Sequence, residues 1–315
     1  MSENGIKNRG ELVFLYDVRD ANPNGDPDNA NYPRMDEETG ENIVTDLRLK
    51  RTIRDFWMSR GEEVLVRAET DEKGNRKSMA DLVRDFLGIK AVDKKKKEET
   101  QSRILDELPK TYIDVRAFGA AVTLEGANLQ ITGAAQFGLG RSLNKPNVKS
   151  LTITTTLSSG TEKGQGTIGE YHIVDYSLIR FHGIISEINA RVTGFSESDL
   201  EKLFTAMWDG TLQLNTRSKF NHTSRLLIYT QMKPGKPQIG DLDLSVRLYG
   251  DDNPKSIEEV QLDISELLDR IKVFKDDIDT ITVKINDELK TVDSTGKAIN
   301  LIQELENLGI SVKEL

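Results

Sequence analysis

Acidic and amide side chains alternate along one loop near the amino terminus, a pattern that can hold a metal ion. They fall at every second position, at Asp20, Asn22, Asn24, Asp26 and Asp28. A calcium loop begins in this way, but its twelfth position is a bidentate glutamate, which here is Asn31. The loop is also rich in proline and glycine, so we interpret it as a structural turn. A one-metal site for RNA cleavage on Asp26, Asp28 or Asp36 is the alternative.

No other catalytic constellation is indicated. The chain has no cysteine, and its three histidines, His172, His182 and His222, are too scattered to build a metal site alone. It contains no GxSxG, HExxH or P-loop motif. A GxGxxG motif spans Gly164 to Gly169, but it lies between a polar loop and an extended segment, so we interpret it as a hairpin tip. We therefore expect a non-enzymatic protein without a cofactor or metal.

Basic and polar side chains gather in four places. They are Lys50, Arg51 and Arg54 in a predicted helix, Arg116 beside Phe118, Gln136, Arg141, Ser142 and Lys145 in a glycine-rich segment, and Arg217 and Lys219 before a predicted strand. Cations, amides and hydroxyls bind phosphates without reading base sequence, and glycines allow close approach of the backbone. Each cluster has a plain alternative as solvated surface, and Arg116 has a second one as the ion-pair partner of Asp114.

The net charge of −9 is concentrated at one end of the chain. Residues 251–315 carry 16 acidic and 8 basic side chains, so the first 250 residues have a net charge of only −1. A nearly neutral body with local basic clusters can bind a phosphate backbone. The sequence has no apolar run of membrane-spanning length and no apolar amino-terminal segment, so we expect a cytoplasmic protein without a membrane partner.

The predicted elements that position these residues follow the order β-α-β-β-α-β. The strands are Leu12 to Val18, Tyr112 to Leu124, Tyr171 to Ser186 and Ser224 to Met232. The first helix starts after Thr45, and the second begins with a capping box of Ser198 and Glu201. A charged helical insertion follows the first helix, and a hairpin protrudes between the middle strands. This order predicts an α+β fold of the split-βαβ or ferredoxin-like kind that RNA recognition modules share.

Four segments, taken together in order and spacing, resemble a known family. They are Tyr16 to Asp28, Val44 to Phe56, Asp114 to Val122 and Thr132 to Asn144. The chain thereby resembles the backbone subunit of type I CRISPR Cascade complexes, the seventh Cas family in its type I-B-like branch and part of the RAMP superfamily. The resemblance covers about residues 11–232. No single segment would be enough to indicate this family.

The resemblance implies a hand-shaped protein. Its modified RRM palm would occupy residues 1–250, with a helical insertion at about residues 60–110 and a β-hairpin thumb at about residues 138–172. Residues 251–315 would form an acidic extension packed on the palm. Such a subunit binds CRISPR RNA as a multimer, alongside copies of itself and other Cascade subunits, and supports pairing of the guide with target DNA.

By position, the resemblance also assigns roles to residues. Lys50, Arg51 and Arg54 match the basic first helix of the family, Arg116 matches its DVR strand, and Gln136, Arg141 and Ser142 match its glycine-rich segment. We predict that these residues, with Lys145, Arg217 and Lys219, contact phosphates.

Two alternatives stay open. One is a metal-dependent endonuclease subunit that cuts target RNA in a type III-like complex. The other is a stand-alone RRM-like module that binds short RNA as a monomer.

Overall fold

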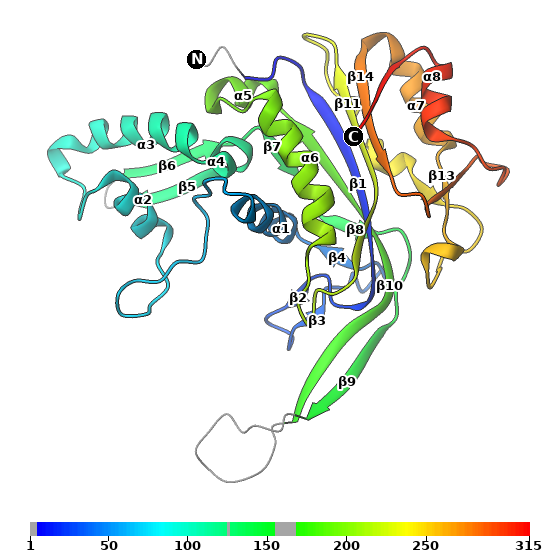
Figure 1. The fold of residues 1–315 in the computed structure, drawn as a ribbon, viewed down its shortest axis with the longest axis horizontal. Helices are drawn as coiled ribbons and strands as arrows, with labels where there is room; N and C mark the ends of the chain where they lie inside the picture. Colours follow the sequence, from blue (N-terminus) through cyan, green and yellow to red (C-terminus); the bar gives the residue numbers. More distant parts are fainter. Residues whose placement is uncertain (1–4, 125–126, 155–167) are drawn as a thin grey trace.

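The structure is a computed structural model that describes residues 5–124, 127–154 and 168–315. Its largest sheet runs in the order β16-β14-β11-β1-β10-β8-β4, and β7 and β9 also pair with β10 (Figure 1). These strands are β1 (Gly10–Ala21), β4 (Ile43–Val44), β7 (Ala135–Phe137), β8 (Gly140–Ser142), β9 (Val148–Thr154), β10 (Ile168–Ile185), β11 (His222–Met232), β14 (Ile278–Ile285) and β16 (Ser311–Glu314). The chain therefore has the mixed α+β architecture that its sequence predicts.

Strand β1 lies at the centre of this sheet and is buried on both faces. It pairs antiparallel with β10 on one side and with β11 on the other. Leu12 and Phe14 pack into the core on one face, whereas Val13 and Leu15 pack into the core on the other face. The prediction of a buried central strand at this position is confirmed, because apolar residues at both alternating positions need cover on both sides.

Three helices cover one face of the sheet, namely α1 (Asp46–Ser59), α5 (Glu187–Thr193) and α6 (Glu197–Leu212) (Figure 1). The predicted cap of α1 is confirmed, since the Thr45 side chain accepts a hydrogen bond from the backbone of Arg48. The predicted cap of α6 is wrong by two residues. Ser196 and Asp199 form the capping box, which leaves Ser198 in the first turn of the helix.

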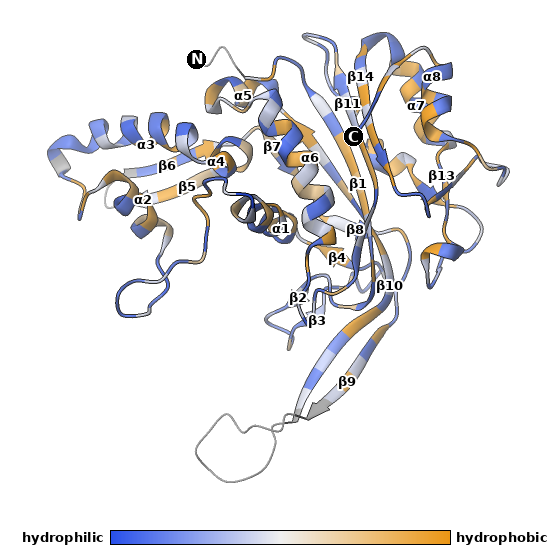
Figure 2. Ribbon diagram, in the orientation of Figure 1, coloured by the Kyte–Doolittle hydropathy of each residue, from blue (hydrophilic) through white to orange (hydrophobic). Residues whose placement is uncertain are grey.

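The opposite face is covered by the chain beyond β11. This part contains η2 (Leu242–Ser245), β12 (Arg247–Leu248), η3 (Ile257–Glu259), β13 (Gln261–Asp263), α7 (Ser265–Phe274), η4 (Lys275–Asp277), β15 (Lys290–Val292) and α8 (Leu301–Asn307). Leu267, Ile271 and Leu301 pack with Val13 and Ile228 of the sheet. Figure 2 shows hydrophobic residues concentrated on the central strands and on the helix faces that meet them. Both faces of the central strands β1 and β11 are thus largely closed to solvent.

A separate lobe follows α1, with its own core. It contains α2 (Met79–Leu87), η1 (Lys94–Lys96), α3 (Lys97–Thr111), α4 (Ile113–Phe118) and a two-stranded sheet of β5 (Gly119–Leu124) and β6 (Ala127–Thr132). Leu82, Ile104, Leu108 and Val122 pack in the core of this lobe. The segment predicted as a helical insertion therefore contains helices, and the lobe continues past residue 110 as a hairpin.

The predicted sheet strand from Tyr112 to Leu124 is wrong. Residues 113–118 form helix α4, and β5 pairs with β6 instead of joining the main sheet. Helix α4 lies between two cores, with Val115 in the core of the lobe and Ala117 in the main core. Because apolar residues on several sides of this helix are buried, its sequence resembles the alternating pattern of a strand. Gly119 ends the helix at φ +81°, where a Cβ would lie 2.0 Å from the carbonyl oxygen of Ile131.

A hairpin of β9 and β10 extends beyond the sheet (Figure 1). Beside its base lies a small hairpin of β2 (Gly25–Asp26) and β3 (Tyr32–Pro33). The GxGxxG motif from Gly164 falls almost entirely outside the described residues. In the ranges that the structure describes, no helix combines the length and the apolar character needed to cross a membrane.

Removal of residues 251–315 tests the cover of the sheet. We expect the remaining chain to aggregate, because it would expose the apolar side of β1 and β11. Size-exclusion chromatography and near-ultraviolet circular dichroism measure this outcome. Deletion of residues 151–168 is the matched control, and it should leave a monodisperse and cooperatively melting protein. A monodisperse chain of residues 1–250 with native dichroism would contradict the prediction.

Candidate nucleic-acid interface

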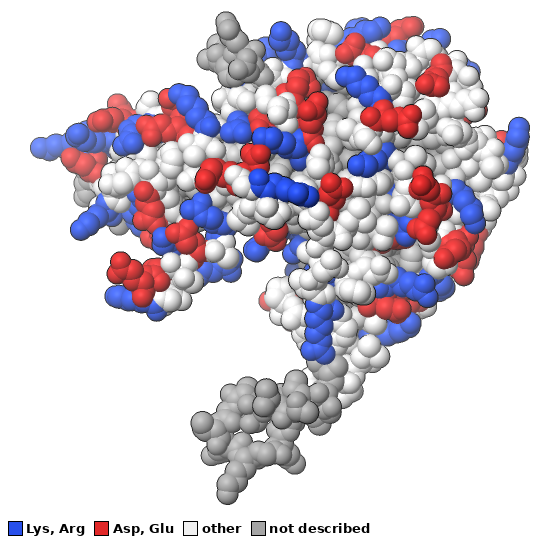
Figure 3. All heavy atoms as spheres, viewed as in Figure 1, with Lys and Arg blue, Asp and Glu red and all other residues white. Residues whose placement is uncertain are grey.

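Charged residues of both signs are mixed over most of the surface. Figure 3 shows Lys and Arg side chains interspersed with Asp and Glu over the helical lobe and over the carboxyl-terminal region. The face in view has no broad basic surface. On this face, a phosphate-binding site would therefore have to be local, at a place where cations lie without ion-pair partners.

A cleft of about 560 Å³ lies at the base of the β9–β10 hairpin. Four parts of the chain meet there: the loop after β1, the first turn of α1, the start of the long strand β10, and the loop before β11. The residues that line it are Asn22, Asn24, Gly25, Ala30, Asn31, Arg48, Glu170, Tyr171, His172, Arg217, Ser218 and Lys219. It combines cations, amides, a hydroxyl, a glycine and an aromatic ring, which are the groups that bind a nucleic-acid backbone.

Three cations in this cleft, Arg48, Arg217 and Lys219, lack acidic partners. Arg48 donates to the Thr52 hydroxyl at 2.9 Å, and Lys219 donates to the backbone carbonyl of Asn22. The guanidinium of Arg217 lies 5.5 Å from the centroid of the Tyr171 ring. Within the described part of the chain, none of the three forms an ion pair with a carboxylate. The charge of this group is therefore available to an external anion.

The pKa values of three groups at the cleft are lowered, mainly by burial and in two of them also by neighbouring positive charge. Burial, with a smaller contribution from the charge of Arg48, lowers the pKa of Lys219 to about 8. Burial also lowers the pKa of Arg48 below its ordinary value. Burial and the charges of Lys219 and Arg48 lower the pKa of the neighbouring His222 to about 3. An anion bound in the cleft would relieve the repulsion that these groups exert on one another.

The loop after β1 is held in place by its amide side chains. The side-chain oxygen of Asn24 accepts hydrogen bonds from the backbone N–H and from the hydroxyl of Thr45, both at 2.9 Å. These bonds tie the loop to the start of α1. The backbone N–H of Asn22 donates to the carbonyl of Ser218 at 2.8 Å, which ties it to the loop before β11. The Asp, Asn and Gly residues therefore serve as a structural turn that also positions the cleft.

The acidic residues of this loop do not converge on a point. Asp26 forms an ion pair with Arg34 at 3.1 Å, and Asp36 forms one with Arg141 at 2.8 Å. Among residues 5–124, 127–154 and 168–315, no group of three acidic or histidine side chains could hold a metal ion.

The three basic residues predicted on the first helix have carboxylate partners within the chain. Lys50 pairs with Asp46 at 2.9 Å and Arg51 pairs with Asp55 at 2.7 Å, each one turn away on α1. Arg54 is buried and pairs at 2.8 Å with Asp114, which is fully buried. These contacts give the side chains a structural role, and their contact with RNA stays a prediction.

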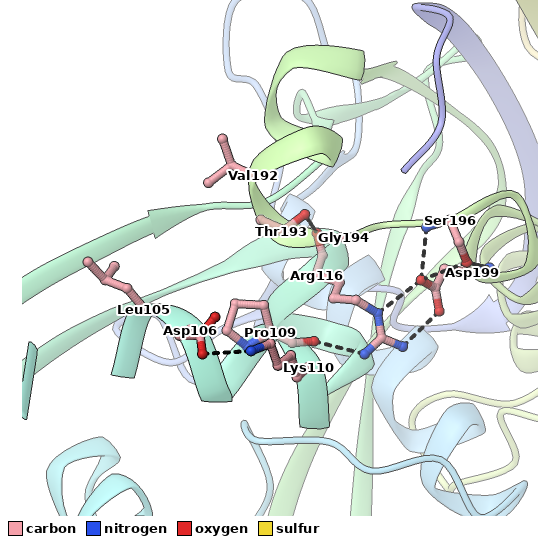
Figure 4. Close-up of a pocket in the computed structure, with 10 residues that line it drawn as sticks. All are labelled: Leu105, Asp106, Pro109, Lys110, Arg116, Val192, Thr193, Gly194, Ser196 and Asp199. Carbon is pink, nitrogen blue, oxygen red and sulfur yellow. Dashed lines mark hydrogen bonds and ion pairs between the residues drawn. The ribbon is translucent and has the colours of Figure 1, made fainter. Parts of the chain in front are cut away.

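Arg116 lies on helix α4 rather than on a strand, and its partner is not Asp114. Figure 4 shows its guanidinium directed at Asp199, with two hydrogen bonds of 2.9 and 2.8 Å, and at the carbonyl of Pro109. Burial alone would raise the pKa of Asp199, but the hydrogen bonds from Arg116 and Ser196 lower it below its ordinary value. This pair joins the lobe to α6.

The glycine-rich segment contributes no side chain to the cleft lining. Arg141 pairs with Asp36 and Glu41, at 2.8 and 2.9 Å. Ser142 is buried and donates to the Asn144 carbonyl at 2.6 Å. Gln136 donates to the Gly133 carbonyl at 3.1 Å, and Lys145 is exposed with its methylene chain beside Gly40.

Of the predicted phosphate contacts, Arg217 and Lys219 line the cleft and the other eight do not. Sequence reasoning missed Arg48 and Tyr171. Arg48 belongs to the basic helix, but it projects from the side opposite Lys50 and Arg54. Arg48 is a candidate phosphate contact because it has no carboxylate partner among the described residues. The sequence alone does not reveal this.

Comparison with protein families identifies the family of this chain. The model of the family described as CRISPR-associated protein Cas7 matches residues 8–265. The chain belongs to the Cas7 family. The resemblance inferred from the four sequence segments is thereby confirmed. The CRISPR-associated protein Cas7 of Haloferax volcanii is 30% identical over 334 aligned residues, which cover 98% of this chain and 96% of that relative.

Solved structures share the fold of this Cas7 protein. A chain of a structure described as "CRISPR RNA-guided surveillance complex, pre-nicking" matches at a TM-score of 0.50 and 12% identity, covering 96% of this chain and 99% of that chain. A chain of another "CRISPR RNA-guided surveillance complex" matches at a TM-score of 0.50 and 14% identity, covering 91% and 95%. At these identities the similarity concerns the fold.

Alanine substitutions at Arg116 and Arg217 should separate stability from binding. Arg116→Ala leaves the Asp199 carboxylate buried without its partner, so we expect a loss of about 3 kcal/mol in the free energy of unfolding. Arg217→Ala removes no ion pair and should cost less than about 1 kcal/mol. We expect only Arg217→Ala to weaken binding of single-stranded RNA by the folded protein. Urea denaturation and fluorescence anisotropy measure the two effects, and the reverse pattern would contradict this assignment.

The pKa of Lys219 predicts how binding depends on pH. Above about pH 8 the free protein has lost the Lys219 proton, so phosphate binding must take up a proton. RNA affinity should then fall with rising pH, by up to about tenfold per pH unit. Lys219→Arg should abolish the decline, because arginine stays protonated, whereas Lys145→Arg outside the cleft should retain it. A decline that persists unchanged in Lys219→Arg would show that another group titrates.

Proposed function

We propose that this Cas7 protein is a CRISPR RNA-binding backbone subunit of a type I interference complex. The observation that carries the proposal is the cleft that Arg48, Arg217 and Lys219 line, because these three cations form no ion pair with Glu170, the carboxylate in the same lining, or with any other described residue. The protein binds the sugar-phosphate chain of the guide there. The two surveillance complexes of similar fold are described as RNA-guided, which supports an RNA ligand.

The chemistry of the cleft suits recognition of backbone rather than bases. Cations, amide donors and a hydroxyl bind phosphate oxygens and carry no information on base identity. In RNA-guided complexes, sequence is read by pairing between guide and target, and the protein holds the guide through its backbone. The arrangement therefore fits a subunit that accepts any guide sequence and leaves the bases free to pair with target DNA.

The sheet topology supports a modified RRM palm. Strands β11, β1, β10 and β7 or β8 lie in this order and are antiparallel, with α1 and α6 on one face, as in a split-βαβ arrangement. The α2 to β6 lobe then corresponds to the helical insertion, and the β9–β10 hairpin to the thumb.

A stand-alone RRM-like module is a poorer fit to this chain. Such modules stack bases on an open sheet face that lies opposite their helices. Here that face is covered by the apolar residues of α7, α8 and the strands around them. The RNA site consequently lies at the end of the sheet, among loops. A site of this kind can be repeated from one copy to the next along a single guide, alongside other Cascade subunits in the cytoplasm.

The subunit acts without cleaving RNA. The alternative, a metal-dependent endonuclease of the type III kind, needs acidic side chains that are free to hold a metal. Asp26 and Asp36 instead form ion pairs with Arg34 and Arg141, and Asp28 is exposed on the surface of the loop. These contacts favour a structural role for the loop.

RNA of graded length tests the proposal. We expect the purified protein to form multimers whose mass rises in steps with the length of a CRISPR transcript, because each copy covers a fixed stretch of backbone. Multi-angle light scattering measures the mass. Incubation with matched RNA and Mg²⁺ should leave the RNA intact, with Asp26→Ala as the control. A single bound copy at every length would favour the stand-alone module, and cleavage that Asp26→Ala abolishes would favour the endonuclease.

A further inference from the structure

We propose that copies of this Cas7 protein dock head to tail, with one side of α5 on one copy packed in a groove beside β4 of the next copy. The inference rests on the proposed function, in which several copies share one guide, and it assigns the two surfaces by which they meet. The first surface, the α5 knob, consists of Ile188, Arg191 and Val192. The second, the β4 groove, has a volume of about 640 Å³.

The α5 knob exposes apolar side chains that the fold leaves uncovered. Ile188 is 57% exposed, and Val192, one helical turn further on, is 76% exposed. Figure 4 shows Val192 projecting from α5, away from the Arg116–Asp199 pair. Among the described residues, no other two large exposed apolar side chains lie one turn apart on a helix. Single exposed apolar residues need no explanation, whereas a pair on one side of a helix indicates a contact surface.

The β4 groove offers a concave apolar wall at which such side chains can be buried. Ile43, Leu139, Pro146 and Val148 belong to this wall. Leu139 is 52% exposed, so the wall is open to a partner. A groove of this volume is large enough for the side chains of the α5 knob.

The unpaired charges of the two surfaces have opposite signs. In the groove, Asp26 forms an ion pair with Arg34, whereas Glu37 is exposed and has no ion-pair partner among the described residues. On the knob, Arg191 is exposed and likewise lacks an ion-pair partner in the described part of the chain. It lies three residues after Ile188, on the same side of the helix. Docking would pair Arg191 with Glu37, and such complementary charges fix the register of an interface.

The two surfaces lie at opposite ends of the central strands. Helix α5 follows Ile185 of β10, which pairs with Gly10 at the start of β1. Val148 in the groove pairs with Val174 of β10, which also pairs with Ala21 at the end of β1. Figure 1 shows α5 at one end of the sheet and β2, β3 and β4 towards the other. A contact between two different surfaces can be repeated from copy to copy, which produces an open filament unless the rotation closes a ring.

The β2–β3 hairpin lies between the groove and the RNA cleft. Asp26 and Tyr32 line the groove, whereas the neighbouring residues Gly25 and Asn31 line the cleft. A copy packed in the groove would therefore lie beside RNA bound in the cleft, where one guide can pass from copy to copy. An RNA that spans two copies also raises their effective concentration, so a modest contact between them is sufficient.

Two aspartate substitutions test the inference on the full-length protein with RNA of several lengths. Val192→Asp disables the knob and Leu139→Asp disables the groove, and each variant should bind an RNA that holds one copy with natural affinity. On an RNA that holds several copies, each should bind about tenfold more weakly than the natural protein, because the copies no longer support one another. Fluorescence anisotropy measures the affinity, and multi-angle light scattering measures the mass of the complex.

An equimolar mixture of the two variants distinguishes head-to-tail docking from other contacts. The Val192→Asp variant keeps its groove and the Leu139→Asp variant keeps its knob, so one copy of each can dock. The mixture should recover most of the natural affinity on an RNA that holds two copies, and stay weaker than the natural protein on longer RNA. Val273→Asp is the matched control, because Val273 is 78% exposed on α7 and belongs to neither surface. This variant should assemble like the natural protein.

A charge exchange provides a second test that does not depend on the apolar residues. Arg191→Glu and Glu37→Arg should each weaken binding to long RNA by about threefold. The variant with both reversals should recover the natural affinity, because the same pair forms with its charges exchanged. If an aspartate variant does not melt cooperatively, this exchange decides the matter.

The outcomes separate the docking inference from the proposed function. Natural assembly by the folded aspartate variants, no recovery in their mixture, or no recovery in the charge exchange would overturn the docking of α5 in the groove. Guide binding would then stand. Failure of the natural protein to bind RNA, or a single bound copy at every RNA length, would instead contradict the proposed function itself.

Discussion

An acidic chain can bind a polyanion only where its cations are kept apart from its own carboxylates. Many cations of this Cas7 protein are not kept apart from carboxylates. Arg54, Arg116, Arg141 and Arg225, for example, each pair with an acidic residue. These pairs hold the lobe, the helices and the sheet together. In the cleft, Arg48, Arg217 and Lys219 form no ion pair with a described residue, so an external anion bound there would complete the electrostatics.

The second constraint is that both faces of the sheet are used for folding. Helices α1 and α6 cover one face, and the carboxyl-terminal region covers the other. A sheet enclosed in this way cannot offer a flat surface for bases, so a nucleic acid must bind at the ends of the strands. Loops gather there, and the first strand and the first helix position them rigidly. The carboxyl-terminal region therefore contributes to the fold by closing one face of the central strands.

Signals from residues close together in the sequence predicted much of the fold. Contacts between residues far apart in the sequence could not be predicted. Strand β1 and helix α1 follow from apolar periodicity and an N-cap, which involve residues close in sequence. Helix α4 was mistaken for a strand because burial in two cores hides the helical period. The ion-pair partners of the basic residues could not be predicted for a similar reason: Arg116 is 83 residues from Asp199, and no local pattern reveals that they pair. Arg217 and Lys219, which line the cleft, lie in a loop that has no acidic residue nearby in the sequence.

The small number of unpaired cations in the cleft has a consequence for the affinity for RNA. Three charges per copy give a weak and salt-sensitive contact with single-stranded RNA, since each neutralised phosphate contributes a limited release of counterions. An isolated copy should therefore leave unrelated transcripts largely unbound. Copies aligned on one guide, as proposed above, would act together, because each bound neighbour would raise the effective concentration of the next. Under the proposed function, strong binding would thus be a property of the assembly rather than of the single chain.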